Sequence, residues 1–117
     1  MMITALAIAV GLVPQHAPAI PAQQQPCRRS NYRCRFRRLP LAWRRWAHAT
    51  SYCESKDDPT IHNSTGIYHG AFQFTLGTWK AAGGRSDDPH VVPWWGQAFK
   101  AVHLAKTDGT QHWPVCG

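Results

Sequence analysis

A single glutamate, Glu54, stands out in this chain of 117 residues as a candidate for acid–base chemistry. Residues 41–54 carry apolar side chains at helical spacing, and at about 100° per residue Glu54 returns to within about 20° of Trp43. The carboxyl group therefore projects from the apolar face, away from Arg44 and Arg45. The residues that define this face are Trp43, Trp46, Ala47, Thr50 and Cys53.

A carboxyl group on an apolar face has two interpretations. Partial burial disfavours the charged carboxylate and raises its pKa, so that Glu54 can hold a proton near neutral pH. Such a group can protonate a leaving oxygen, and cleavage of a glycosidic bond is the commonest task of this kind for a lone glutamate. The alternative is a salt-bridged or surface-tilted glutamate at a frayed helix end.

Side chains suited to binding a sugar follow Glu54 in the chain. A glycan site needs flat aromatic surfaces for the sugar faces and polar groups for the hydroxyls. Each candidate also has a structural interpretation, since Tyr68 and Trp79 fit a core and Asn63 and Ser64 are common turn formers. The predicted substrate-binding residues are Asn63, Ser64, Tyr68, Gln73, Trp79 and Trp113.

Three helices and a loop are predicted to position these side chains. Residues 60–71 are rich in Thr, Asn, Ser and Gly, which indicates a loop with a short hairpin around 64–66. The predicted fold class is mainly α: a small single helical domain closed by a disulfide. The predicted helices cover 41–54, 75–82 and 93–108. The residues expected to stop them are 57–59, 83–84 and 108–109.

The length and charge of the chain limit the classes of function. A chain of this length forms one small domain, and no apolar run reaches the roughly 18 residues that span a bilayer. Six of the seven net positive charges lie in residues 27–38, because residues 39–117 carry seven Lys or Arg against six acids. Residues 23–39 are therefore predicted to be a basic, Cys-containing linker or arm. Its arginines are Arg28, Arg29, Arg33, Arg35, Arg37 and Arg38.

This arm has three possible roles. It could bind an anionic surface or a nucleic acid, or it could be a solvated tail. For an exported protein we expect the arm to bind an anionic cell envelope and no specific nucleic acid. We expect the protein to be a monomer.

The four cysteines predict two disulfides, with three possible connectivities. The simplest pairing joins Cys27 to Cys34 and Cys53 to Cys116. A 53–116 bridge would close a loop of about 64 residues and stabilise the domain by roughly 4 kcal/mol in the chain-entropy model. The competing interpretation is a zinc site, since the chain has seven histidines. No Cys-x2-Cys or His-x3-His spacing is present, so we expect neither a metal nor an organic cofactor.

The N-terminus has the features of an export signal. Residues 3–13 form an apolar run, and Ala17-Pro18-Ala19 gives a small-x-small cleavage pattern, although no Lys or Arg precedes the run. The alternative is a buried helix, which Pro14, Pro18 and Pro21 disfavour. We therefore expect residues 1–22 to be a signal peptide and the protein to be secreted or bound to the cell wall.

Several runs together resemble one known family. They are Cys53-Glu54-Ser55, residues 64–74, Thr78-Trp79 with Gly83-Gly84, and residues 113–117. Over about residues 41–117 the chain resembles the resuscitation-promoting-factor, transglycosylase-like domain of actinobacteria and their phages.

The resemblance implies a compact α+β, lysozyme-like catalytic domain over residues 40–117 that needs no cofactor. It implies cleavage of the β-1,4 bond between N-acetylmuramic acid and N-acetylglucosamine in peptidoglycan strands, with Glu54 as the catalytic acid. Ser64 falls near the family's hydroxyl-bearing position and Gln73 on its glutamine. The family's disulfide maps onto Cys53 and Cys116.

The chain departs from the family pattern at three places. Lys56-Asp57 replaces a glycine pair, Gly96 replaces a glutamate, and Thr110 replaces a tryptophan. The reaction could be a hydrolysis or a lytic transglycosylation with an anhydro product. The rival functions are a non-catalytic peptidoglycan-binding module and a cationic protein that binds nucleic acid or membranes.

Overall fold

The computed structural model describes residues 5–6, 11, 18–85 and 88–117. Most of the predicted signal peptide, residues 1–22, lies outside these described residues. No helix among them has both the length and the apolar character needed to cross a bilayer.

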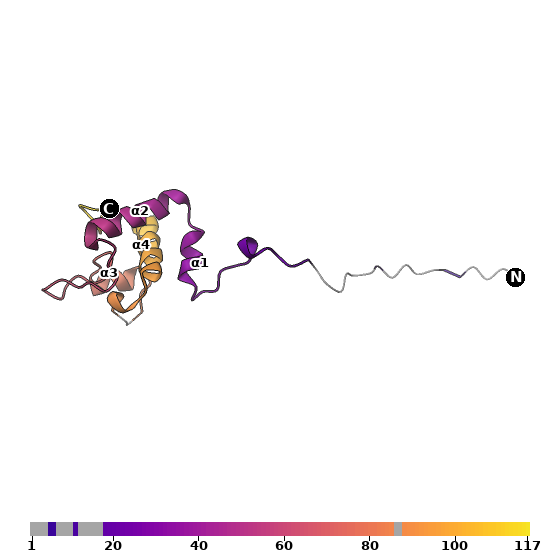
Figure 1. Ribbon diagram of the computed structural model, residues 1–117, viewed down its shortest axis with the longest axis horizontal. Helices are drawn as coiled ribbons and strands as arrows, with labels where there is room; N and C mark the ends of the chain where they lie inside the picture. Colours follow the sequence, from indigo (N-terminus) through magenta and orange to yellow (C-terminus); the bar gives the residue numbers. More distant parts are fainter. Residues whose placement is uncertain (1–4, 7–10, 12–17, 86–87) are drawn as a thin grey trace.

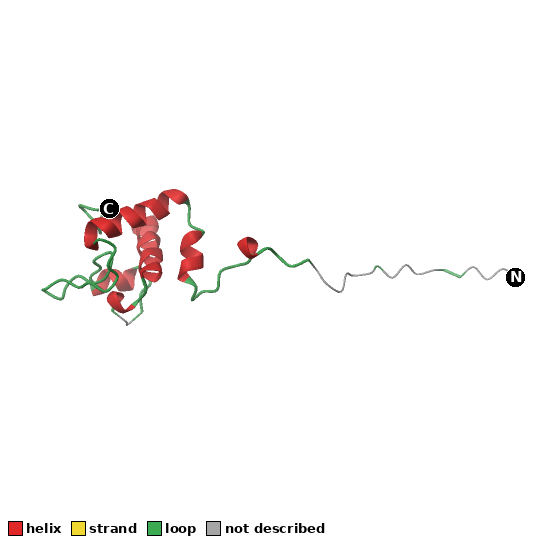
Figure 2. Ribbon diagram, viewed as in Figure 1, coloured by secondary structure: helices red, strands yellow, loops and turns green. Residues whose placement is uncertain are grey.

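The described part of the chain is mainly helical, as predicted (Figure 2). This described part holds no strand. Each predicted helix is confirmed: the longest two begin directly after Pro40 and Pro93, and the side chain of Thr75 caps the third by accepting from the backbone N–H of Thr78. The helices are α1 (Tyr32–Arg37), α2 (Leu41–Ser55), α3 (Leu76–Ala81) and α4 (Trp94–Asp108), with short 3-10 turns η1 (Ala22–Gln24) and η2 (Pro89–Val91).

Helix α1 is the main difference from the sequence-based expectation. Figure 1 shows α1 beside α4, and the two helices are in contact. Phe36 of α1 is only 2% exposed and meets the rings of Trp94 and Trp95 at 5.3 and 5.5 Å between centroids. Part of the predicted arm, residues 23–39, is therefore packed against the body.

The many arginines of α1 made its apolar face hard to recognise in the sequence. The guanidinium of Arg35 lies 4.1 Å from the ring centroid of Phe99, and that of Arg33 lies 5.3 Å from the ring centroid of Trp95. These contacts let charged side chains cover aromatic ones, so a run that looks like a solvated arm can pack. Gly96 provides the space, because a Cβ there would lie 2.7 Å from Val92 and 3.5 Å from Tyr32.

Aromatic rings form much of the core. Trp46 stands edge-on to Trp113 with ring centroids 5.1 Å apart, and Phe74 does the same to Trp79 at 5.2 Å. Edge-to-face pairs of this kind stabilise beyond the area that they bury. The partly buried tryptophans that pack against this core are Trp43, Trp46, Trp94 and Trp95.

The segment between α2 and α3 has the expected short hairpin without forming strands. His62 and His69 face each other in an antiparallel bridge, and His69 makes a second bridge with Phe74. The side-chain oxygen of Asn63 accepts from Thr65 Oγ1 and from the backbone N–H of Ile67, which shapes the turn.

Gln97 of α4 ties this hairpin and its neighbours together. Its side chain is fully buried, and its Oε1 accepts from the backbone N–H of Ala71 at 2.7 Å. Its Nε2 lies 2.7–2.9 Å from the carbonyls of Pro59, Pro89 and Val92, which share its two N–H groups. One amide therefore contacts backbone groups of two segments, those between α2 and α3 and between α3 and α4, neither of which has a sheet to provide partners.

Two disulfides complete the fold. Cys27 is bonded to Cys34 and Cys53 to Cys116, which is the simplest pairing considered from the sequence. The first links α1 to the chain before it, and the second links the last turn of α2 to the C-terminus.

We predict that Gln97→Met lowers the free energy of unfolding by about 3 kcal/mol or more, because each buried polar group left without a partner costs about 1–3 kcal/mol. Urea denaturation followed by tryptophan fluorescence measures the change. The control is Gln111→Met, at an exposed position, which should shift stability by less than about 0.5 kcal/mol. Equal effects of the two substitutions would contradict the role given to Gln97.

Candidate active site

Glu54 lies in the last turn of α2 and faces a cavity of about 320 Å³. The residue is partly buried, as expected for a carboxyl on the apolar face of the helix. Residues from the hairpin and from the C-terminal segment surround it. The cavity is lined by Glu54, Tyr68, Gln73, His112, Pro114, Val115 and Cys116.

The C-terminal side of the cavity is fixed to α2 and to the core. The disulfide of Cys116 to Cys53 places the C-terminal segment next to Glu54, and Thr50 Oγ1 adds a bond of 3.4 Å to the carbonyl of Cys116. Trp113 is buried, and its Nε1 donates to the carbonyl of Phe72 at 2.8 Å. These contacts hold His112, Pro114 and Val115 beside the carboxyl group.

The hairpin side is held by a serine next to Glu54. Ser55 Oγ lies 2.8 Å from the carbonyl of Ala71, which joins the end of α2 to the hairpin. Gln73 has a positive φ of 50°, and its Nε2 donates to the carbonyl of Gly70 at 2.9 Å. These contacts hold Gln73 at the cavity, which Tyr68 of the same hairpin also lines.

Burial raises the pKa of Glu54 above its ordinary value of 4.5. The neighbouring Asp58 behaves in the opposite way: two hydrogen bonds from Thr60 lower the pKa of its carboxyl group. Asp57 and Asp58 are both exposed, and neither lines the cavity. Among the described residues around this cavity, Glu54 is thus the one carboxyl group, and it is the one suited to carrying a proton.

The structure brings only part of the predicted substrate-binding set to the cavity. Tyr68 and Gln73 line it. The side chain of Asn63 instead shapes the hairpin turn, and Ser64 is exposed and does not line the cavity. Trp79 and Trp113 are 1% and 3% exposed, so the structure places these two rings in the core instead of along a groove. Edge-to-face packing among aromatic rings removes them from the surface.

Sequence reasoning missed three lining residues: His112, Pro114 and Val115. A signal for them existed, because a bridge between Cys53 and Cys116 necessarily brings the residues before Cys116 next to Glu54. His112 adds a second titratable side chain to the cavity, and its Nε2 lies 2.7 Å from Asp108 Oδ2.

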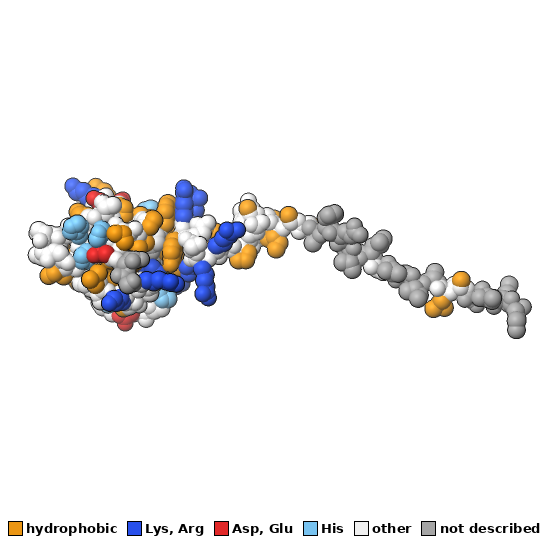
Figure 3. All heavy atoms as spheres, turned by 90° about the horizontal axis from the view of Figure 1, so that it is seen from below, with side chains coloured by type: hydrophobic (Ala, Val, Ile, Leu, Met, Phe, Trp, Pro, Cys, Tyr) orange, Lys and Arg blue, Asp and Glu red, His pale blue; other side chains and the backbone are white. Residues whose placement is uncertain are grey.

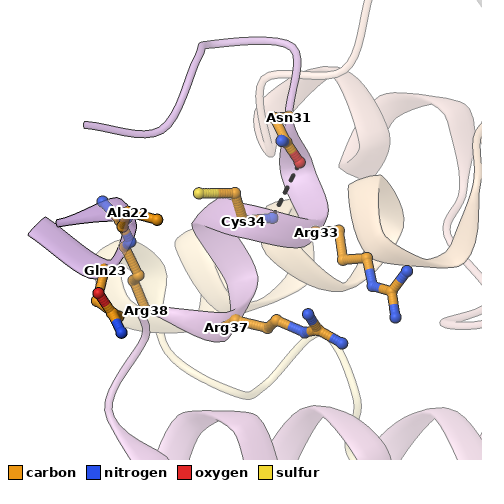
Figure 4. Close-up of a pocket in the computed structure, with 7 residues that line it drawn as sticks. All are labelled: Ala22, Gln23, Asn31, Arg33, Cys34, Arg37 and Arg38. Carbon is orange, nitrogen blue, oxygen red and sulfur yellow. Dashed lines mark hydrogen bonds between the residues drawn. The ribbon is translucent and has the colours of Figure 1, made fainter. Parts of the chain in front are cut away.

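A larger cavity, of about 490 Å³, lies on the basic segment and not near Glu54. Figure 3 shows Lys and Arg side chains gathered where the N-terminal segment leaves the body. In Figure 4 the side chains of Arg33 and Arg37 extend to the same side of α1, while that of Arg38 lies beside the η1 turn. Arg38 donates to the carbonyl of Ala22 at 3.0 Å. No carboxyl group lines this cavity, so it offers no candidate acid of the kind that Glu54 provides.

The helix that carries Glu54 ends in two residues with positive φ. Lys56 has φ 54° and Asp57 has φ 64°, which is the left-handed region that glycine adopts without cost. The expected family pattern has glycines at these two positions. The turn next to the candidate catalytic residue is therefore strained in this chain.

A comparison with known protein families matches most of the described body. The transglycosylase-like domain matches residues 42–116, which is more than half of the chain. The chain belongs to this family of transglycosylase-like, resuscitation-promoting-factor domains.

A curated relative supports the same family. The chain is 33% identical over 79 residues to resuscitation-promoting factor RpfE of Mycobacterium tuberculosis, which covers 68% of this chain and 45% of the relative. The chain thus spans about half the length of that protein. No solved structure matches this chain significantly.

We predict that Lys56→Gly stabilises the protein by about 1 kcal/mol, because it relieves the left-handed strain at this position. The matched control is Lys106→Gly, at an exposed helical position in α4 with ordinary negative φ. That change should destabilise by about 0.5–1 kcal/mol. Urea denaturation measures both, and a loss of stability in both variants would exclude strain at Lys56.

Proposed function

We propose that the chain cleaves the glycan strands of peptidoglycan and that Glu54 is its general acid. The observation that carries this proposal is the position of Glu54. The sole glutamate of a transglycosylase-like domain is partly buried in a cavity, and its pKa is raised by burial alone.

The proposed reaction starts with the proton held by Glu54. The carboxyl group gives this proton to the glycosidic oxygen between N-acetylmuramic acid and N-acetylglucosamine, and the bond from C1 to that oxygen breaks. The sugar develops oxocarbenium character, which a nucleophile then quenches at C1. Tyr68 and Gln73 are the proposed substrate-binding residues in the cavity, with His112 beside them.

The nucleophile is either water or the 6-hydroxyl of the muramic acid. In both routes the Glu54 carboxylate takes the proton of the attacking hydroxyl. A hydrolase with two carboxylates needs a second acid at the cavity, and Asp57 and Asp58 do not line it. This arrangement supports a route with one glutamate, as in lytic transglycosylation.

We predict that Glu54→Gln lowers the turnover of purified peptidoglycan by at least about 100-fold, the usual contribution of a general acid. The rate of the wild type should fall as the pH rises through the raised pKa of Glu54, because the protonated acid is lost. Release of soluble muropeptides measures the rate, and mass spectrometry separates hydrolysed from anhydro products.

The control for this test is Asp57→Asn, which changes an exposed carboxyl group three positions away and should leave the rate unchanged. Asn also tolerates the left-handed backbone at this position. Equal turnover by the wild type and by Glu54→Gln would exclude catalysis by Glu54 and leave a peptidoglycan-binding module as the function.

We also propose export to the cell wall, where the basic segment contacts anionic polymers. Two disulfides support an oxidising compartment. Arg28 and Arg29 are exposed and precede α1, so their charge is available to a partner without disturbing the core.

We predict that replacing both Arg28 and Arg29 with Ser weakens binding to cell walls that retain their anionic polymers. It should also lower the salt dependence of that binding, because fewer ionic contacts remain. Sedimentation at increasing salt measures the bound fraction. The control pair is Lys80→Ser with Lys106→Ser, two exposed charges on α3 and α4. Binding that salt does not change would contradict the proposal.

A further inference from the structure

A second cluster of titratable side chains lies outside the Glu54 cavity. His69 comes from the hairpin, and Asp88 and His90 come from the segment before α4. One nitrogen or oxygen atom from each of the three lies within 4.8 Å of the others. None of them lines the cavity of Glu54. In Figure 3 histidine side chains are grouped beside an acidic one on the face that is seen from below.

Both histidines point a ring nitrogen at the same carboxylate oxygen. Asp88 Oδ1 lies 2.6 Å from Nδ1 of His90 and 3.1 Å from Nδ1 of His69. The same oxygen also accepts from the backbone N–H of His90 at 3.3 Å and so caps the η2 turn. Three nitrogen groups thus converge on one oxygen atom.

The ring nitrogen of His69 is not satisfied by this arrangement. His69 is 7% exposed, and the approach of its Nδ1 to Asp88 lacks the alignment of a hydrogen bond. Within the described residues this nitrogen has no hydrogen-bond partner. A buried polar atom without a partner is costly, so its presence at a convergence of ligand-type groups points to a bound species.

We propose that His69, Asp88 and His90 bind one divalent transition-metal ion, with zinc as the best match. Imidazole nitrogens suit zinc, copper and nickel, whereas calcium and magnesium prefer sites built from oxygen atoms. Two imidazoles and one carboxylate form a common donor set for zinc. The ion would give the orphaned nitrogen of His69 a partner.

The distances fit such an ion after a small movement. Zinc bonds to nitrogen and oxygen are about 2.0–2.2 Å long, so tetrahedral ligand atoms lie about 3.3 Å apart. The separation of 3.1 Å between His69 and Asp88 is close to this value, and an outward rotation of the half-buried ring of His90 would widen its separation of 2.6 Å from Asp88. His62 is exposed, and its ring centroid lies 5.2 Å from that of His90, which places it within reach of a fourth position.

This ion would have a structural effect on the site of Glu54. It would join the hairpin to the segment before α4, two loops that otherwise depend on Gln97. Tyr68 precedes His69 in the chain and lines the Glu54 cavity, so a metal at His69 would also hold that side of the cavity in place. The proposal does not depend on whether Glu54 is catalytic.

The test is metal binding to the full chain, prepared without an affinity tag, with both disulfides formed and with metals removed by a chelator. Isothermal titration with zinc should show one equivalent bound. Cobalt should give the intense visible absorption of a four-coordinate ion. Absence of saturable zinc binding would overturn the proposal.

Substitutions of the proposed ligands test where the ion binds. Asp88→Asn and His90→Gln should each weaken zinc binding by at least about 10-fold, the scale on which even groups that only support a ligand act. The matched control is His103→Gln, at an exposed position on α4, which should bind like the wild type. Unchanged affinity in both ligand variants, or lost binding in the control, would overturn the assignment.

NMR of the wild-type protein tests the same site without relying on substituted variants, which can fail to fold. Zinc should shift the ring resonances of His69 and His90 in the NMR spectrum and leave those of His103 in place. Shifts confined to histidines outside the cluster would reject this site.

Discussion

One buried side-chain amide, that of Gln97, connects the loops of this domain to its core. The domain has no sheet among its described residues, so the backbone groups of its loops need partners from side chains. Gln97 contacts four backbone groups of two loops from one position on α4. Gly70 is shaped by the same contact, because a Cβ there would lie 2.3 Å from Oε1 of Gln97.

The candidate active site depends on this connection and on one disulfide. Gln97 fixes the hairpin that carries Tyr68 and Gln73, and the bond between Cys53 and Cys116 fixes the opposite side of the cavity. Glu54 lies between them at the end of α2. Its carboxyl group is partly withdrawn from water, and this withdrawal is the physical reason that its pKa rises.

The basic segment has two physical roles in one short helix. Phe36 packs into the core, while arginines on α1 lie over aromatic rings and leave their charge at the surface. Binding to an anionic surface and packing of the body are therefore compatible here. Removing this segment would remove part of the core as well as the charge.

The sequence by itself determined the local features: the three helices after residue 40, the hairpin turn and the place of Glu54 on an apolar face. Periodicity and turn residues determine these because they act between residues a few positions apart. The tertiary structure decided that Trp79 and Trp113 are buried, that α1 packs on α4, and that Gln97 joins the loops. It also brought His69 next to Asp88. These contacts join residues distant in the chain, and no local pattern encodes them, because they depend on which surfaces the folded core leaves in contact.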